Sequence, residues 1–160
     1  MFNGIDDGEQ FGGDRIISKA LEIVERRMRA GSVFVDGAND LTTYLRLKLG
    51  NLDYEAFYVV YLDLGGKILH HEILFRGSLT SSHVYPREVM REVFKHNAAS
   101  LIIAHNHPQG TAECSPVDIT MTKNLMEALS YIDCVVMDHI VITASTSYSL
   151  DEHGLMPILS

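Results

Sequence analysis

A short apolar run between two helical patterns is the feature that most limits how this chain can fold. Residues 100–107 (SLIIAHNH) are apolar before they end in polar residues, and Pro108 stops the run. Such a run is typical of a short buried strand. Pro86 and Ser115 are start signals for helices before and after it. A strand placed between two helices favours an α/β architecture.

Patterns of helix and strand alternate along the rest of the chain. Asp14 is a candidate cap for the first helix, after a loose arm over residues 1–13 that is rich in Gly and Asp. Residues 64–67 (LGGK) are typical of a hairpin turn. In chain order, we expect helices over residues 15–30, 41–49, 86–97 and 115–132, and strands over residues 57–64, 68–76, 100–107, 134–143 and 147–150. This order predicts an α/β or α+β sandwich with a mixed sheet.

Composition narrows the class of protein. The 160 residues, 46% of them hydrophobic, are enough for one domain with its own core. The net charge of −8 argues against binding a nucleic-acid backbone through overall positive charge. Two cysteines are too few for a disulfide framework, which favours a reducing compartment. Because we find neither a signal-peptide pattern nor an apolar run of about 18 residues, we expect a cytoplasmic protein that does not enter a membrane.

The pattern in residues 104–118 (AHNHPQGTAECSPVD) indicates a metal site. His105 and His107 are two residues apart, so both imidazoles point to one side of a strand. Asp118 follows at the third position of the next helix and supplies a third ligand. Two imidazoles and one carboxylate leave the fourth position of a zinc ion open for water, as in catalytic rather than structural sites. Taken singly, Asp118 fits a capping box and each His fits an ordinary strand residue, but the set favours a metal.

Ser115 and an upstream carboxylate complete the chemistry that a zinc-bound water needs. The Ser115 hydroxyl can cap the helix and also donate to an oxyanion. A general base must take the proton of the water. Glu55, just before one predicted strand, and Glu72, within the next, are the two candidates. The residue pattern alone leaves both open, since each also fits a surface carboxylate.

These residues resemble a known family. His105-x-His107-Pro108, followed after residues 109–114 by Ser115-x-x-Asp118, resembles the JAMM motif of MPN-domain zinc metallopeptidases. The segments 84–89 (VYPREV), 104–108 (AHNHP), 138–139 (DH) and 149–154 (SLDEHG) resemble the RadC group of that superfamily. The likeness covers about residues 39–156, so we divide the chain into an N-terminal arm and helix (1–38) and a RadC-like MPN/JAMM domain (39–160). Gln109 departs from the family, which usually has Ser there, but this position is not a ligand.

The resemblance implies a fold and an activity. The fold would be a cytidine-deaminase-like, three-layer α/β/α sandwich with a mixed sheet. It would hold one zinc ion per chain on His105, His107 and Asp118, with Ser115 assisting. JAMM enzymes carry the catalytic Glu at the start of a strand after a helix, which selects Glu55 and leaves Glu72 as the substitute. Many members cleave isopeptide bonds of ubiquitin-like modifiers, so a peptide or isopeptide substrate is implied.

Functions other than hydrolysis also have to be compared with the sequence. RadC proteins carry a DNA-repair label, and the every-fourth-residue series Arg87, Arg91 and Lys95 is the only candidate surface for a nucleic-acid-associated module without peptidase activity. Interleaved glutamates make a solvated helix face the favoured interpretation of that series. Residues 1–38 hold too little for the helix-hairpin-helix region that often precedes the domain in RadC proteins. Zinc deamination is disfavoured, because His107 stands where those enzymes need Glu and a Cys pair is missing. A catalytically idle interaction domain is the third hypothesis.

A few remaining residues have two interpretations. Asp138-His139, inside an apolar strand, fits either support for the metal site or an internal hydrogen-bonded pair. His70 and His71 lie on opposite faces of a strand and are treated as ordinary. Cys114 lies in the metal loop as a rival ligand, and Cys134 is a core residue. Substrate specificity is expected from the loops 77–85 and 109–114.

Overall fold

The computed structural model describes residues 7–30, 38–77 and 84–159. The elements in chain order are α1 (Asp7–Ala30), α2 (Ala38–Leu49), β1 (Ala56–Leu62), β2 (Ile68–Arg76), α3 (Pro86–His96), β3 (Ser100–Asn106), α4 (Pro116–Ser130), β4 (Val135–Ile142) and β5 (Ser147–Ser149). Most expected elements lie within one to three residues of their predicted bounds, and β2 has the predicted bounds.

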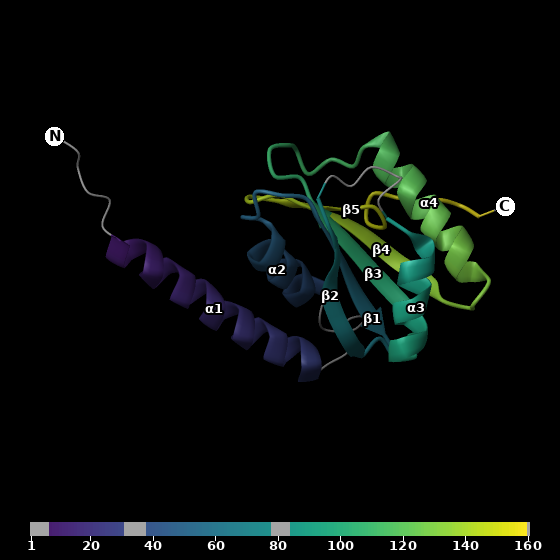
Figure 1. Cartoon of the computed structure of the whole chain (residues 1–160), viewed down its shortest axis with the longest axis horizontal. Coiled ribbons are helices and arrows are strands. Elements are labelled where there is room, and N and C mark those ends of the chain that lie inside the picture. Colours follow the sequence, from purple (N-terminus) through teal and green to yellow (C-terminus); the bar gives the residue numbers. More distant parts are fainter. Residues whose placement is uncertain (1–6, 31–37, 78–83, 160) are drawn as a thin grey trace.

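The strands form one mixed sheet between two helical layers. The strand order is β2-β1-β3-β4-β5. Only β3 and β4 pair in parallel, while the other neighbours are antiparallel. α1 and α2 lie on one side of the sheet, and α3 and α4 lie on the other (Figure 1). The predicted α/β/α sandwich with a mixed sheet is therefore confirmed.

Each face of the sheet carries its own hydrophobic core, because side chains alternate along a strand. In β1, Tyr58, Val60 and Leu62 pack with α1 and α2. Phe57 and Tyr61 face the other way and pack with α3 and α4. Every residue of β1 is buried, which fits a central strand covered on both sides.

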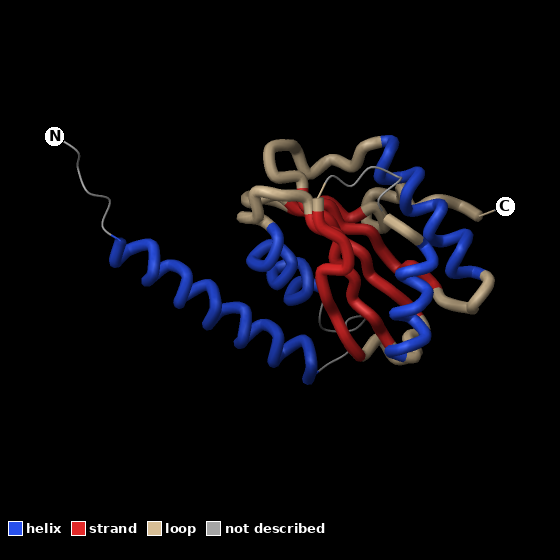
Figure 2. The backbone as a smooth tube through the Cα atoms, viewed as in Figure 1, coloured by secondary structure: helices blue, strands red, loops and turns tan. Residues whose placement is uncertain are grey.

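The first helix begins earlier than the sequence predicted. It starts at Asp7, not at Arg15, so residues 7–13 are not a loose arm. The prediction failed because it treated the glycines near Asp14 as helix breakers, whereas each costs a helix only about 0.5–1 kcal/mol relative to Ala. Gly31, which follows the predicted end of this helix, lies outside the described residues, as do residues 78–83 of the expected specificity loop. The tube in Figure 2 shows the beginning of α1 extending well away from the sheet.

Candidate metal centre

The carboxyl end of β3 and the first turn of α4 bring three predicted ligands together. His105 lies in β3, His107 follows its last residue, and Asp118 is the third residue of α4. His105 Nε2 lies 2.9 Å from His107 Nε2 and 3.2 Å from Asp118 Oδ1. His107 Nε2 lies 3.6 Å from Asp118 Oδ2. These three residues are one of the two groups among the described residues whose ligand atoms converge closely enough for a metal ion.

These distances fit the ligand shell of a zinc ion. Zinc binds His nitrogen and carboxylate oxygen at about 2.0–2.2 Å in a tetrahedron, which separates neighbouring ligand atoms by about 3.3 Å. The three observed distances lie on both sides of that value. His105 and Asp118 are almost fully buried, whereas the His107 side chain is 20% exposed. The centre is therefore accessible from solvent on the His107 side.

A backbone carbonyl fixes the tautomer of His107. Its Nδ1 lies 2.8 Å from the carbonyl oxygen of Thr111. A carbonyl can only accept, so Nδ1 carries the proton and donates it. The lone pair of a neutral His107 is then on Nε2, which is the atom that faces His105 and Asp118. A metal ligand needs this arrangement.

A chain of hydrogen bonds from α4 fixes the tautomer of His105 in the same way. The Thr122 hydroxyl donates to the Asp118 carbonyl oxygen at 2.7 Å. It must then accept from His139 Nδ1, which lies 2.6 Å away. The Nε2 atom of a neutral His139 is left to accept from His105 Nδ1 at 2.8 Å. The lone pair of a neutral His105 is therefore on Nε2, so lone pairs of both rings and of the Asp118 carboxylate face one point, as in a metal site.

The pKa values of the residues at the centre are shifted by their mutual contacts and by burial. Burial by itself would raise the pKa of Asp118, but its interactions with the adjacent rings of His105 and His107 hold it well below its usual value. The hydrogen bond with Asp118 raises the pKa of His107 against the opposing effect of burial, and the charge of Glu55 adds to the rise. Burial lowers the pKa of His139, which keeps that ring neutral and able to accept from His105.

Ser115 holds the aspartate in place. It caps α4, and its hydroxyl accepts the Asp118 N–H at 3.2 Å, as the predicted capping box requires. The Ser115 N–H and hydroxyl donate to Asp118 Oδ2 at 2.7 and 2.8 Å. Asp118 Oδ1 remains turned toward His105. In this structure the hydroxyl proton of Ser115 is therefore directed at the carboxylate.

Asn106 holds the backbone around Glu55 against the strand that carries the histidines. Asn106 lies between His105 and His107 in the sequence, and its side chain is buried. Its Oδ1 accepts the Ala56 N–H at 2.7 Å, and its Nδ2 donates to the Tyr54 carbonyl at 2.9 Å. These two bonds fix the backbone on both sides of Glu55. The sequence analysis missed this role, although the alternation of a strand turns the residue between two same-facing histidines to the other face.

The other candidates lie elsewhere. Glu72 pairs with Val59 in the sheet and its carboxylate accepts from Tyr61, whereas His105 pairs with Phe57. Tyr61 is four residues along β1 from Phe57, or about 13 Å in a strand. The converging metal group contains no atom of Cys114, and Cys134 is buried as expected.

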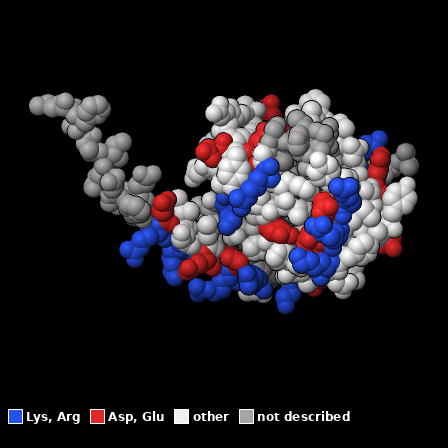
Figure 3. Space-filling model, viewed as in Figure 1, with Lys and Arg blue, Asp and Glu red and all other residues white. Residues whose placement is uncertain are grey.

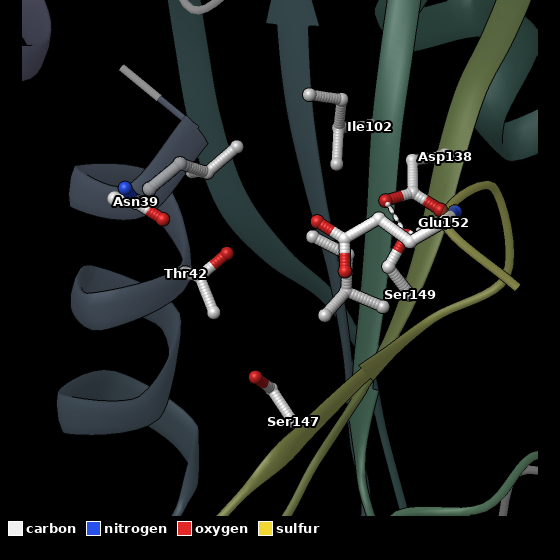
Figure 4. Close-up of a pocket in the computed structure, with 9 residues that line it drawn as sticks. Asn39, Thr42, Ile102, Asp138, Ser147, Ser149 and Glu152 are labelled. Atoms are coloured by element: carbon white, nitrogen blue, oxygen red, sulfur yellow. Dashed lines mark hydrogen bonds between the residues drawn. The ribbon is translucent and has the colours of Figure 1, made fainter. Parts of the chain in front are cut away.

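The Asp138-His139 pair serves both purposes that the sequence left open. His139 supports His105, as described above. Asp138 faces the opposite side of the sheet, where it lines a pocket of about 240 Å³ beside α2. Its carboxylate accepts from the Ser149 hydroxyl at 2.6 Å, drawn as the dashed line in Figure 4. It also accepts the N–H groups of His139 and Asp151.

The basic series on α3 is neutralised by glutamates of the same helix. Arg91 lies 2.6 Å from Glu88, and Lys95 lies 2.7 Å from Glu92. Arg87 lies 3.4 Å from Glu88. Figure 3 shows positive and negative side chains interleaved over this helix. The series has the character of a solvated helix face and offers little free positive charge to nucleic acid.

A mixed sheet between two helical layers, with this His-His-Asp group at a strand end, has the architecture of a JAB/MPN domain. The family model for the RadC-like JAB domain matches residues 35–155. The chain belongs to that family.

The chain is also similar to several UPF0758 proteins over most of its length. The chain is 50% identical over 111 residues to a UPF0758 protein of Janthinobacterium sp. (strain Marseille). It is 40% identical over 141 residues to one of Variovorax paradoxus (strain S110). The aligned regions cover 69% and 88% of this chain but only 50% and 62% of those relatives. The UPF0758 protein YfjY of Escherichia coli (strain K12) is 37% identical, and 89% of each chain is covered. Within the described residues, the helices are all too short or too polar to cross a membrane.

Proposed function

We propose that this domain is a zinc-dependent hydrolase that cleaves peptide or isopeptide bonds. The observation that carries the proposal is the convergence of His105 Nε2, His107 Nε2 and Asp118 Oδ1, with both ring tautomers set for a metal. A zinc ion held there would lower the pKa of a bound water to about 7 and polarise a carbonyl oxygen. Two imidazoles and one carboxylate leave a ligand position open for such a water.

Glu55 is the proposed general base. It lies between α2 and β1 and directly precedes β1. That strand pairs with β3, which bears His105. The charge of Glu55 contributes to the raised pKa of His107, which supports a place for this carboxylate within electrostatic range of the centre. In the proposed reaction, Glu55 takes one proton from the attacking water and later gives it to the leaving amine. Asn106 would hold the backbone of Glu55 in position for both steps.

Ser115 is the proposed donor to the oxyanion that forms at the scissile carbonyl. Its hydroxyl lies at the mouth of α4, one hydrogen bond from Asp118. The backbone N–H of Ser115 also donates to that carboxylate, so Asp118 stays held when the hydroxyl turns toward substrate. A donor to the oxyanion contributes about 10²–10³ in rate in other hydrolases.

The test distinguishes the role of the zinc ion from the role of the general base by measuring zinc content and cleavage in the same variants. Purified wild-type protein with zinc is expected to cleave a mixture of fluorogenic random-sequence peptides or an isopeptide-linked fluorogenic lysine. Glu55→Gln is expected to keep its zinc content and to lose cleavage by at least about a hundredfold. Glu127→Gln is the matched control, because this glutamate is exposed on α4, outside the loops expected to contact substrate, and the variant should cleave normally.

Two results would contradict the proposal. One is a folded protein that binds no zinc at the centre while all three ligands are intact. The other is cleavage that persists in Glu55→Gln at the wild-type rate. Because the chain spans half to three fifths of the length of the first two relatives, the substrate and partners of the whole protein belong to the proposal as well.

A further inference from the structure

A second group of metal-binding side chains lies between the edge strand β2 and the end of α3. It consists of His70, Glu72 and His96, which we call the β2–α3 cluster. One nitrogen from each ring and one carboxylate oxygen all lie within 4.8 Å of one another. His70 and Glu72 share a face because they are two residues apart on β2, and α3 contacts this strand. The sequence analysis treated His70 as ordinary because it lies on the opposite strand face from His71, and it did not consider His96 on the next helix.

His96 brings a nitrogen without a partner into this cluster. Its Nε2 is buried, and it is the one buried side-chain N or O atom among the described residues that makes no hydrogen bond. The nearest charged atom is Glu92 Oε2 at 3.5 Å, which is an ion-pair distance but no hydrogen bond. Buried polar atoms almost always have a partner, so an orphaned one calls for a water, an ion or a ligand. In the tautomer that carries its proton on Nδ1, His96 Nε2 presents a lone pair to a cation.

The carboxylate of Glu72 gives the cluster a ligand suited to a cation. Glu72 accepts from the Tyr61 hydroxyl at 3.3 Å, whereas the Glu92 carboxylate behind His96 is already paired with Lys95 at 2.7 Å. The Tyr61 bond restricts one oxygen of Glu72 and leaves the other to a ligand. Burial, together with nearby positive charge, lowers the pKa of His96.

We propose that the β2–α3 cluster binds a borderline divalent transition-metal ion such as Zn²⁺ through His70, Glu72 and His96. Two imidazoles and a carboxylate form a ligand set that zinc accepts. This site would tie the edge strand of the sheet to the last turn of α3. It is independent of the proposed hydrolytic function, since it shares no residue with the centre at β3 and α4.

Binding must rearrange one ring. The His70 and His96 rings now stack with centroids 4.1 Å apart and planes 14° from parallel. The lone pairs of two stacked rings lie in parallel planes and cannot both point at one ion. The His70 side chain is 40% exposed, whereas that of His96 is 18% exposed. His70 is therefore the ring that turns, and it closes its present 3.9 Å separation from Glu72.

The experiment counts Zn²⁺ equivalents by calorimetric titration, with far-UV circular dichroism as the check on folding. His105→Ala/His107→Ala removes the first centre and is expected to retain one equivalent of Zn²⁺. Adding His96→Gln to that variant should weaken the remaining binding by at least about tenfold. His71→Gln is the matched control, because His71 is the adjacent histidine on the opposite face, where it contacts Tyr58 and Glu25.

Each outcome decides the proposal. Retained binding that is lost with His96→Gln and kept with His71→Gln supports it. If the double variant binds no Zn²⁺, or binds it equally with and without His96, the proposal is wrong. Should His105→Ala/His107→Ala fail to fold, the wild-type chain serves instead, with two equivalents expected and one after His96→Gln. A wild-type count of one that His96→Gln leaves unchanged would then overturn the second site without touching the first.

Discussion

At the scale of single residues, Thr122 acts on His105 through one intervening ring. Its hydroxyl has one proton, which it gives to the Asp118 carbonyl, so it can only accept from His139. Thr122→Val keeps the shape but removes that acceptor. We expect the zinc Kd of the first centre to rise about 10–100-fold, the usual cost of losing an outer hydrogen bond behind a metal ligand. Competition with a chromophoric chelator measures this change.

Thr120 supplies the control for this prediction. It lies on the same helix and donates the same kind of bond, to the Pro116 carbonyl at 2.9 Å. It is exposed and contacts no histidine in any described hydrogen bond. Thr120→Val should leave the zinc Kd unchanged. Equal effects of the two substitutions would mean that helix stability, not the orientation of His105, governs metal affinity.

Asn106 connects the proposed base to the metal-binding strand. Asn106→Ala would leave the Ala56 N–H, which is fully buried, without an acceptor. Such an orphaned group costs about 1–3 kcal/mol, so the free energy of unfolding in a urea titration should fall by that amount. Cleavage should fall at unchanged zinc content, because the backbone of Glu55 loses its anchor. Asn124→Ala, on an exposed position of α4, should change stability by less than about 0.5 kcal/mol.

Zinc content and cleavage together decide whether Asn106 positions Glu55. If Asn106→Ala lost zinc together with activity, the side chain would serve the histidines rather than Glu55. If activity per folded molecule were unchanged, the two hydrogen bonds would be structural only.

At the scale of elements, the end of α2 shows how closely the layers approach. A Cβ on Gly50 would lie 2.6 Å from the Arg46 carbonyl oxygen and 3.0 Å from that of Thr143. Both obstacles are backbone: the first lies in the last turn of α2 and the second in the segment after β4, so the end of α2 would have to distort as well as shift. Gly50→Ala should destabilise the fold by about 1–3 kcal/mol and lower Tm by about 2–4 °C for each kcal/mol. Gly65→Ala is the control in a thermal melt, since its nearest contact is ordinary at 3.4 Å.

The elements themselves were predictable because their signals are local. The capping pair Ser115 and Asp118 predicted the start of α4, and the β-branched run predicted β1. The start of α1 was missed because a pattern of glycines does not reveal that a helix tolerates them. Of the candidate site, the local motif predicted which three side chains would converge. Its supports come from sheet register and helix packing, so Asn106 and the cluster around His96 were not predicted.

At the scale of the whole molecule, the first centre couples metal binding to folding. His105, His107 and Asp118 lie on β3, just after it and on α4, and present converging ligand atoms that a bound cation would link. An ion that binds only the folded chain adds about 2.7 kcal/mol to its stability at a free concentration 100 times Kd. For a chain of this length that corresponds to a rise in Tm of about 5–11 °C.

This rise should be measured in the His96→Gln background, so that only the first centre contributes. Melting curves recorded with zinc and with EDTA are expected to differ by that amount. In the same background, Asp118→Asn should remove most of the difference, because a neutral amide can neither balance the charge of the ion nor replace the carboxylate as a ligand. A zinc-induced shift of equal size in Asp118→Asn would show that the stabilising ion sits somewhere other than between β3 and α4. A protein whose Tm ignores zinc, with His105, His107 and Asp118 intact, would show that these lone pairs are satisfied by protons alone.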